Sequence, residues 1–394
     1  MPLNAKISGR SVVAVTIAAV VTAWLVTASF SFASRRPATQ PYVSGPVYLM
    51  DYFRLRFGYA DPEHPLEAVF NDPSGLFVDR EGTIYFSERR NHVIRKIEGE
   101  RITRVAGTGR GGFSGDSLDA TSVRLWFPEG LTGDNKGNLF VAESANNRVR
   151  RISRDGAIET VAGIGRAGFA GDGGLATQAA ISLPYDVALG PDGEIFIADF
   201  GNNRVRRIAQ DGTISTVAGD GQVGFSGDGG PAHLASLNGP YGIFVDGGGV
   251  LYIADSGNNR VRRVEPDGTI ATIAGTGERG FGGDGGPATL ALFDSPEALF
   301  VTRLGEILIG DEHNHRVRKI LLTGTIETVV GTGDANLCGD GGLSRDACLN
   351  DPEDIYLDRT GNLFLTDGDN HRLRKVGPDM VIETIAGSGP IGPK

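Results

Sequence analysis

The sequence predicts an all-β fold: a six-bladed β-propeller of four-stranded antiparallel blades, with one N-terminal transmembrane or signal helix. Three observations support this prediction. A unit of 55 or 56 residues occurs six times, each unit contains short β-type runs, and an uncharged apolar stretch precedes the first unit. A fixed period of this length, built from short strands, is typical of sheets repeated radially around a ring.

The period is set by a proline that stands just ahead of an apolar run in every unit. These prolines are Pro73, Pro128, Pro184, Pro240, Pro296 and Pro352. Their spacings are 55, 56, 56, 56 and 56 residues. The one shorter spacing falls in the first unit, where the segment before its last run is one residue shorter than in the second unit.

The fourth unit shows why each blade should have four strands. It contains four runs rich in Val, Ile and Tyr, at residues 242–245, 250–254, 260–264 and 269–274. Segments 246–249 and 266–268 separate runs with Gly and Asp, which is the composition of tight turns. The first two runs are almost continuously apolar, which indicates strands covered on both faces by neighbouring blades.

The longest connection follows the fourth run of a unit, and after the fourth unit its second half is predicted to be one helical turn that begins at Pro287. Residues 66–72 resemble the end of this connection. We therefore expect the chain to enter the ring where its carboxyl end stops. The ring should close by contact between the first and sixth blades.

The core of each unit resembles an NHL repeat. In the fourth unit this core is Leu-Tyr-Ile-Ala-Asp at 251–255, followed by Asn-Asn-Arg-Val-Arg at 258–262. With its Ala-Gly-x-Gly and Gly-Asp-Gly-Gly tail, the unit is similar to bacterial and teneurin-type NHL propellers. The resemblance covers all six units and implies a propeller fold. It implies binding more than catalysis, although propellers host unrelated functions.

Residues 1–34 are predicted to be a membrane anchor or a signal peptide. The stretch 11–33 carries no charge and is long enough to span a bilayer as a helix. The alternative is cleavage after the small residue Ala33. Both interpretations place the propeller in the periplasm or extracellular space. An uncleaved helix would hold it at the cell membrane as a single-pass anchor, and a cleaved one would leave it secreted. An inverted anchor with a cytoplasmic propeller stays open, because basic residues balance on the two sides.

The remaining chain divides into a Pro-containing spacer with an aromatic segment, residues 35–65, and the propeller, residues 66–394. The net charge of −10 argues against nucleic acid as a partner, because such binding depends on clustered Lys and Arg.

Two cysteines, Cys338 and Cys348, share the long connection of the fifth unit. They predict a disulfide and an oxidising compartment.

An acidic residue ends the second run of every unit, and an arginine lies in every third run. The acidic residues are Glu88, Glu143, Asp199, Asp255, Asp311 and Asp367. The arginines are Arg95, Arg150, Arg206, Arg262, Arg318 and Arg374. Acid–base catalysis by two carboxyls needs different surroundings that separate their pKa values, and a pair repeated six times does not offer such a difference. We predict structural ion pairs that join strands and blades.

The loop between the second and third runs carries Asn or His at one fixed position. These residues are His92, Asn147, Asn203, Asn259, His315 and His371. The three histidines fall in adjacent units and suggest a zinc site, which some NHL-related lyases use. Equivalent atoms on adjacent blades should lie too far apart to share one zinc. We therefore predict no metal and a common backbone-bonding role. Together with His313, these six residues form a candidate binding surface on the long-loop face.

No P-loop, Gly-x-Ser-x-Gly elbow or His-Glu-x-x-His motif is present. The sequence predicts an exported, membrane-tethered module that binds a ligand or protein or acts as a sensor, with no cofactor. The expected partner is a protein, peptide or glycan outside the cytoplasm, and the propeller should be monomeric. The alternative is a metal-dependent lyase or a lactonase-type hydrolase. An adhesive or envelope-structural role is a third possibility.

Overall fold

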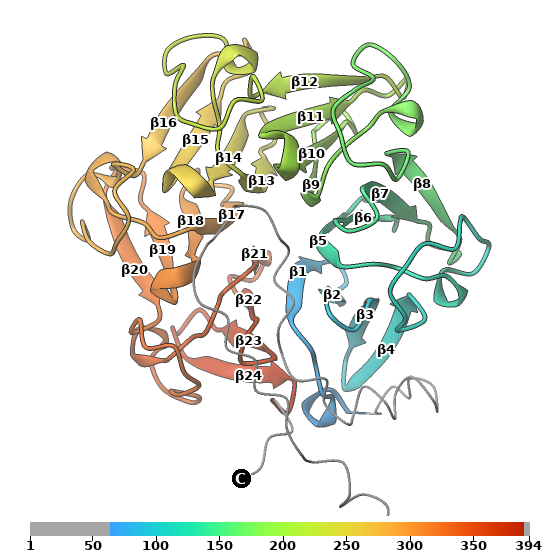
Figure 1. The fold of residues 1–394 in the computed structure, drawn as a ribbon. Coiled ribbons are helices and arrows are strands. Elements are labelled where there is room, and N and C mark those ends of the chain that lie inside the picture. The colour runs from blue at the N-terminus through green and yellow to red at the C-terminus, as the bar shows by residue number, and fades with distance from the viewer. Residues whose placement is uncertain (1–63, 390–394) are drawn as a thin grey trace, which may run out of the picture. The chain divides into compact units, whose positions relative to one another are not determined.

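The computed structural model describes residues 64–389, which all belong to one compact unit, Met50–Lys394. In these residues 24 strands form six antiparallel sheets of four strands each. The sheets surround a common centre, with the first strand of each sheet innermost and the fourth outermost (Figure 1). The predicted six-bladed propeller is confirmed.

Each blade is built from four strands that are consecutive in the chain. The first blade contains β1 (Pro73–Val78), β2 (Ile84–Glu88), β3 (Val93–Glu98) and β4 (Arg101–Ala106). The second contains β5 (Pro128–Gly133), β6 (Leu139–Glu143), β7 (Arg148–Ile152) and β8 (Ile158–Ala162). The third contains β9 (Pro184–Leu189), β10 (Ile195–Asp199), β11 (Arg204–Ile208) and β12 (Ile214–Ala218).

The other three blades repeat this pattern. The fourth contains β13 (Pro240–Val245), β14 (Leu251–Asp255), β15 (Arg260–Val264) and β16 (Ile270–Ala274). The fifth contains β17 (Pro296–Val301), β18 (Ile307–Asp311), β19 (Arg316–Ile320) and β20 (Ile326–Val330). The sixth contains β21 (Ile355–Leu357), β22 (Leu363–Asp367), β23 (Arg372–Val376) and β24 (Ile382–Ala386).

Short 3-10 helices occur at two kinds of position. Those that precede a blade are η1 (Pro65–Glu67), η2 (Ala120–Ser122), η3 (Ala176–Gln178), η5 (Ala232–Leu234), η7 (Ala288–Leu290) and η9 (Ser344–Asp346). Those that follow a second strand are η4 (Phe200–Asn202), η6 (Ser256–Asn258) and η8 (Glu312–Asn314). The helical turn expected after Pro287 is thus present as η7.

The strand boundaries follow from turn chemistry. Between β15 and β16, Gly268 adopts φ +88°, a conformation that glycine reaches without a steric penalty. Its N–H donates to Glu265 O at 2.8 Å, and Asp267 Oδ1 accepts the N–H of Thr269 at 2.9 Å. The innermost strand begins at the proline itself, two residues earlier than predicted in the fourth unit. Proline is tolerated there because the first residue of a strand need not donate to the ladder.

The hydrophobic core lies between blades. One cluster combines Ala254 and Val261 of the fourth blade with Leu299 and Ile309 of the fifth, and Phe293 of the intervening connection fills the space between them. The second strands, such as β14, therefore bury both faces, which explains the continuous apolar runs in the sequence, whereas the outermost strands stay partly exposed. A single blade could not bury these faces alone.

The first and sixth blades meet through the same contacts that join the other blades. Gly387 N donates to Pro65 O at 3.1 Å, and the equivalent bond elsewhere runs from Gly275 N to Ala288 O at 3.0 Å. Phe70 packs into a core cluster with Leu373. No strand is exchanged between these two blades in residues 64–389.

The predicted anchor or signal peptide, residues 1–34, lies outside the described residues. So does the spacer, 35–65, apart from its last two residues. Within residues 64–389, no helix has the length and apolar character needed to cross a membrane.

Candidate binding site at the mouth of the central channel

The repeated arginines are fully buried and each contacts a carboxylate of its own blade. In the fourth blade, Arg262 Nη1 lies 3.2 Å from Asp255 Oδ2, and Arg262 Nη2 lies 2.7 Å from Asp228 Oδ1. The other predicted pairs are also in contact: Glu88–Arg95, Glu143–Arg150, Asp199–Arg206, Asp311–Arg318 and Asp367–Arg374. Each arginine joins two strands of its blade.

The second carboxylate, from the Gly-Asp-Gly-Gly loop, was not predicted as a partner of the arginine. Asp228 belongs to the connection that precedes the fourth blade, so Arg262 joins this connection to the blade. The same contact recurs at Asp116, Asp172, Asp284 and Asp340. The constant separation of 34 residues between this aspartate and its arginine is the sequence signal that could have revealed it.

The Asn/His position bonds the backbone of the next blade. Each of these residues has a positive φ, and its side chain accepts the N–H of the residue before the next anchor proline. The six contacts join His92 to Phe127, Asn147 to Leu183, Asn203 to Gly239, Asn259 to Ser295, His315 to Asp351 and His371 to Asp72. Each of the three imidazoles accepts its bond through Nδ1 from a different backbone N–H.

A different set of residues gathers at the channel mouth. Five of the six innermost strands begin at the anchor proline, and in the sixth blade β21 begins three residues after Pro352. The residue after the proline lies at the long-loop end, because the proline pairs with the acidic end of the second strand. This position varies around the ring, whereas the acidic residue and the arginine of the buried pairs recur in every unit. It is Ser74, Glu129, Tyr185, Tyr241, Glu297 and Glu353. We call these residues, with Asp72, Arg89, Glu312 and Asp351, the acidic mouth.

Arg89 is the cation that links carboxylates of the acidic mouth. Its Nε lies 2.7 Å from Asp72 Oδ2, its Nη2 lies 3.1 Å from Glu353 Oε1, and its Nη1 lies 3.7 Å from Glu129 Oε2. Ser144 Oγ also donates to Glu129 Oε1 at 2.9 Å. Arg89 thereby connects residues of the first, second and sixth blades.

The carboxyl groups of the acidic mouth lie in different environments, which shift their pKa values in different directions. Burial raises the pKa of Glu129 to about 7, although the charge of Arg89 opposes the shift. Burial also raises the pKa of Glu353 well above its usual value. At Asp72 burial favours the neutral form, but the charges of Arg89 and Arg90 prevail and lower the pKa.

A second group of carboxyls lies on the side of the fifth and sixth blades. Burial and the adjacent Glu312 raise the pKa of Glu297 well above its usual value. The same two causes raise the pKa of Asp351 to about 9. Burial of Glu312 favours its neutral form, but hydrogen bonds from Glu297 and Asp351 lower its pKa. The two sides of the mouth thus each contain carboxyls that titrate differently.

Two buried aspartates of the innermost layer, Asp186 and Asp354, join neighbouring blades. Asp186 Oδ2 accepts the N–H of Ile243 at 2.8 Å, and Asp354 Oδ2 accepts the N–H of Leu76 at 2.6 Å. Each aspartate therefore bonds the innermost strand of the next blade. Burial raises the pKa of Asp186 to about 7. Both aspartates line a cavity of about 20 Å³ at the mouth, enough for about one water molecule.

A larger cavity, of about 1000 Å³, opens on the opposite face, where the short turns lie. Its inner wall includes Phe77, Phe300 and Tyr356, and its rim includes charged turn residues such as Arg303 and Asp358. The Tyr356 ring lies 5.6 Å from the Phe77 ring and 5.2 Å from the Phe300 ring, measured between centroids. The two mouths of the channel therefore differ in chemistry, one acidic and one aromatic.

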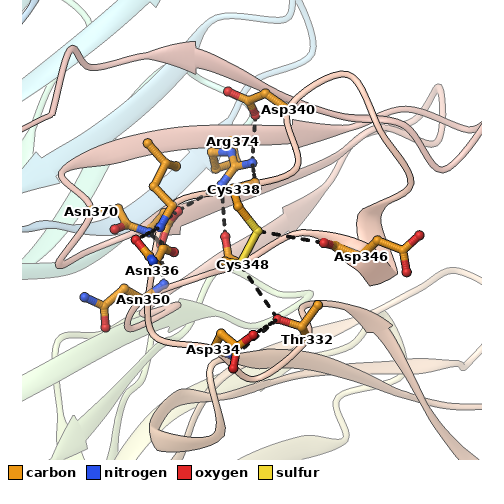
Figure 2. Close-up of a disulfide and its surroundings, with 12 residues drawn as sticks. Thr332, Asp334, Asn336, Cys338, Asp340, Asp346, Cys348, Asn350, Asn370 and Arg374 are labelled. Atoms are coloured by element: carbon orange, nitrogen blue, oxygen red, sulfur yellow. Dashed lines mark hydrogen bonds and ion pairs between the residues drawn. A yellow bond between two sulfur atoms is a disulfide. The ribbon is translucent and has the colours of Figure 1, made fainter.

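The predicted disulfide between Cys338 and Cys348 is confirmed (Figure 2). In the fourth connection, Gly282 and Leu292 form an isolated antiparallel bridge, and the two cysteines form the same bridge in the fifth. Arg374 donates to the backbone oxygens of both cysteines at 3.3 Å. The disulfide therefore reinforces a contact that the other connection makes through its backbone alone.

Comparison with known proteins agrees with this architecture. Residues 217–281 match the teneurin NHL domain, and residues 182–208 match the NHL repeat. The chain is an NHL-repeat β-propeller. Over 224 residues it is 35% identical to Teneurin-1 of Mus musculus, covering 50% of this chain and 8% of that protein.

The NHL-repeat propeller is also 26% identical over 340 residues to Protein SUPPRESSOR OF QUENCHING 1, chloroplastic, of Arabidopsis thaliana, covering 79% of this chain and 31% of that protein. The chain thus spans less than a third of either relative. The solved virginiamycin B lyase from Staphylococcus aureus is similar with a TM-score of 0.51 and 18% identity, over 85% of this chain and 89% of that one. At this identity the likeness shows the fold alone.

Proposed function

We propose that this NHL-repeat propeller is an exported, membrane-tethered binding module whose acidic mouth recognises a cationic group of a protein or peptide partner. One observation carries the proposal. The residue after the anchor proline varies within a repeated scaffold, and this position brings Glu129, Glu297 and Glu353 to one mouth. Arg89 contacts Glu129 and Glu353 but not Glu297, and a further cation at this mouth would favour the ionised form of the buried carboxyls.

Aromatic rings beside the carboxylates strengthen the case for a cation. The Tyr185 ring lies 4.6 Å from the Tyr241 ring and 4.3 Å from the Phe200 ring, measured between centroids. Ammonium and guanidinium groups are attracted to aromatic faces as well as to carboxylates. A lysine or arginine side chain of a partner combines both requirements. A bound cation would also favour the ionised form of Glu129, so binding should strengthen as pH rises through about 7.

Export and tethering rest on the uncharged stretch 11–33 and on the disulfide. A disulfide persists in oxidising compartments outside the cytoplasm and is rare within it. Protease added to intact expressing cells should digest the propeller from outside. Full protection of the propeller in intact cells, with digestion only after lysis, would contradict the proposed location.

The binding proposal is tested by calorimetric titration of the full-length chain with a blocked Lys-Gly-Lys peptide and with a blocked Gly-Gly-Gly peptide. We expect the basic peptide to bind and the neutral one not to. The double variant Glu297→Gln/Glu353→Gln should weaken binding at least tenfold, whereas Glu278→Gln, an exposed site on a long connection, should not. Equal binding of both peptides, or no effect of the double variant, would overturn the proposal.

A second candidate is a metal-dependent lyase or lactonase-type hydrolase. The observation that favours it is the contrast between Asp72, whose pKa is lowered, and Glu353, whose pKa is raised. Neighbouring carboxyls with separated pKa values can act as a base and an acid. A panel of lactones, incubated with the wild-type chain and with Glu353→Gln, tests this candidate. Turnover that the variant abolishes would support an enzyme, and turnover that it retains would argue against these residues as catalysts.

A further inference from the structure

We propose that Glu312, His313 and Asp351 form a binding site for a divalent cation, of the zinc or manganese type, between the fifth and sixth blades. The site lies at the long-loop face, where Glu312 and Asp351 belong to the acidic mouth and His313 adds an imidazole at its edge. The proposal goes beyond partner recognition and does not depend on it, because the three side chains can be tested with the metal alone.

The three side chains are already close together. One ligand atom from each lies within 4.8 Å of the other two, and within residues 64–389 this is the one group of three His, Cys, Asp or Glu side chains that does so. His313 Nε2 lies 3.7 Å from Glu312 Oε2. Two ligands of one zinc ion, with bonds of about 2.0–2.2 Å, are separated by up to about 4 Å. Small rotations of the side chains are therefore enough to place an ion between them.

A buried oxygen without a donor points to a missing positive charge. Glu312 is 9% exposed, and no hydrogen bond reaches its Oε2 among the described residues. Leaving a buried carboxylate oxygen unpaired costs free energy that a bound cation would recover. The adjacent Glu297 is also buried and hydrogen-bonds to Glu312, so a bound cation would favour the ionised forms of both carboxyls.

The site is a local change of side chains on an unchanged backbone. Glu312 and His313 lie in η8, which follows β18 as η6 follows β14 in the fourth blade, where Ser256 and Gly257 occupy the same positions. Asp351 occupies the position of Ser295, the residue before the anchor proline. The backbone of Asp351 is fixed by its bond to the His315 side chain. Two neighbouring blades thus supply ligands at positions that a rigid scaffold already brings together.

The ligand types indicate the class of metal. Imidazole favours zinc and other borderline ions, whereas carboxylates also accept manganese. Three protein ligands leave at least one coordination position for water or for a group of another molecule. His313 is half exposed, with 50% of its side chain accessible, so an ion could enter from solvent.

The test uses the full-length chain, purified without a polyhistidine tag, stripped with a chelator and dialysed against zinc chloride. We expect about one zinc per chain by elemental analysis, and a rise in Tm that grows with zinc concentration. His313→Ala and Glu312→Gln should each weaken zinc binding at least tenfold in calorimetry. His233→Ala, which removes an exposed histidine from η5, is the matched control and should bind as the wild type does.

Asp351→Asn provides a further variant at a positive φ of 67°, a conformation that asparagine tolerates well. It should lose zinc while its Tm without metal stays close to that of the wild type. The proposal is overturned if the wild-type chain retains no zinc after dialysis. It is equally overturned if His313→Ala and Glu312→Gln bind zinc as tightly as His233→Ala does. Binding of the Lys-Gly-Lys peptide is read separately, so failure of one proposal does not hide the outcome of the other.

Discussion

Replacing Arg262 by methionine should destabilise the propeller strongly, because the arginine is fully buried and holds two carboxylates. Asp255 is itself fully buried, 3.2 Å from the guanidinium, and would be left without its counter-charge. Asp228 would lose a contact of 2.7 Å that joins the preceding connection to the blade. Removing one partner of a buried pair costs about 3–5 kcal/mol, because the other charge stays buried and uncompensated.

That cost translates into a measurable shift of the melting temperature. With an unfolding entropy of about 2.1 cal/mol/K per residue over a domain of about 330 residues, a loss of about 4 kcal/mol lowers Tm by about 6 °C. Scanning calorimetry measures this shift. The matched control is Arg263→Met on the same strand. Arg263 forms an ion pair with Glu265 at the surface, and such pairs contribute about 0–1 kcal/mol.

A double variant separates lost packing from the buried charge. Arg262→Met/Asp255→Asn removes both partners, so it should recover part of the loss caused by Arg262→Met alone. The reasoning is refuted if Arg262→Met costs no more than Arg263→Met. It is also refuted if Asp255→Asn adds its full cost to that of Arg262→Met, because the two charges would then act independently.

Three further predictions concern single features of the fold. His315→Asn should change the unfolding free energy by less than about 1 kcal/mol, because asparagine makes the same bond in three other blades. His315→Ala should cost about 2 kcal/mol, because it loses this bond and places alanine at a positive φ of 52°. Urea unfolding of both variants measures the two free energies. Removing the disulfide with Cys338→Ser/Cys348→Ser should cost about 3 kcal/mol, from the entropy of closing a loop with a sequence separation of 10. Urea unfolding with and without reductant checks this, and an unchanged midpoint would contradict it. Burial raises the pKa of Glu129 and of Asp186 to about 7, above the unfolded value near 4, so the folded state retains protons that the unfolded state releases. The stability that these two groups supply is therefore present below about pH 4 and falls as pH rises toward 7, by about 1.4 kcal/mol per pH unit for each group. Glu129→Gln should flatten this decline, and a steeper decline in the variant would refute the assignment.

Most of the fold could be predicted because its determinants are local and repeated six times. A turn such as 266–268 needs Gly268 at a positive φ, and an anchor such as Pro240 marks the start of an innermost strand. The clusters between blades then follow from strands that are apolar on both faces. The six-fold repetition lets each unit confirm the interpretation of the others.

The acidic mouth was missed because its residues stand next to the most regular feature of the unit. Glu129, Glu297 and Glu353 each follow an anchor proline, and in one unit alone such a residue is an ordinary strand position. Their convergence depends on ring closure, which places residues far apart in sequence around one axis. Comparing the units position by position would have shown that this site varies, whereas the Asp255 position stays acidic in all six.

The same reasoning explains what became of the histidine position. The backbone role expected for His92, His315 and His371 has a counterpart in the structure, where each accepts an N–H from the next blade. His313 differs, because it lies two residues before His315 and is directed by η8 toward Glu312. Its departure from the repeat and its neighbour Glu312 were visible in the sequence, but the other carboxylate, Asp351, comes across a blade interface that sequence spacing does not reveal.

The account separates charges that hold the ring together from charges that recognise a partner. The most direct test is the affinity of the full-length Glu297→Gln/Glu353→Gln variant for the Lys-Gly-Lys peptide, measured with its Tm. We predict at least a tenfold loss of affinity while Tm stays within a few degrees of the wild type. An unchanged affinity would contradict the assignment of recognition to the acidic mouth.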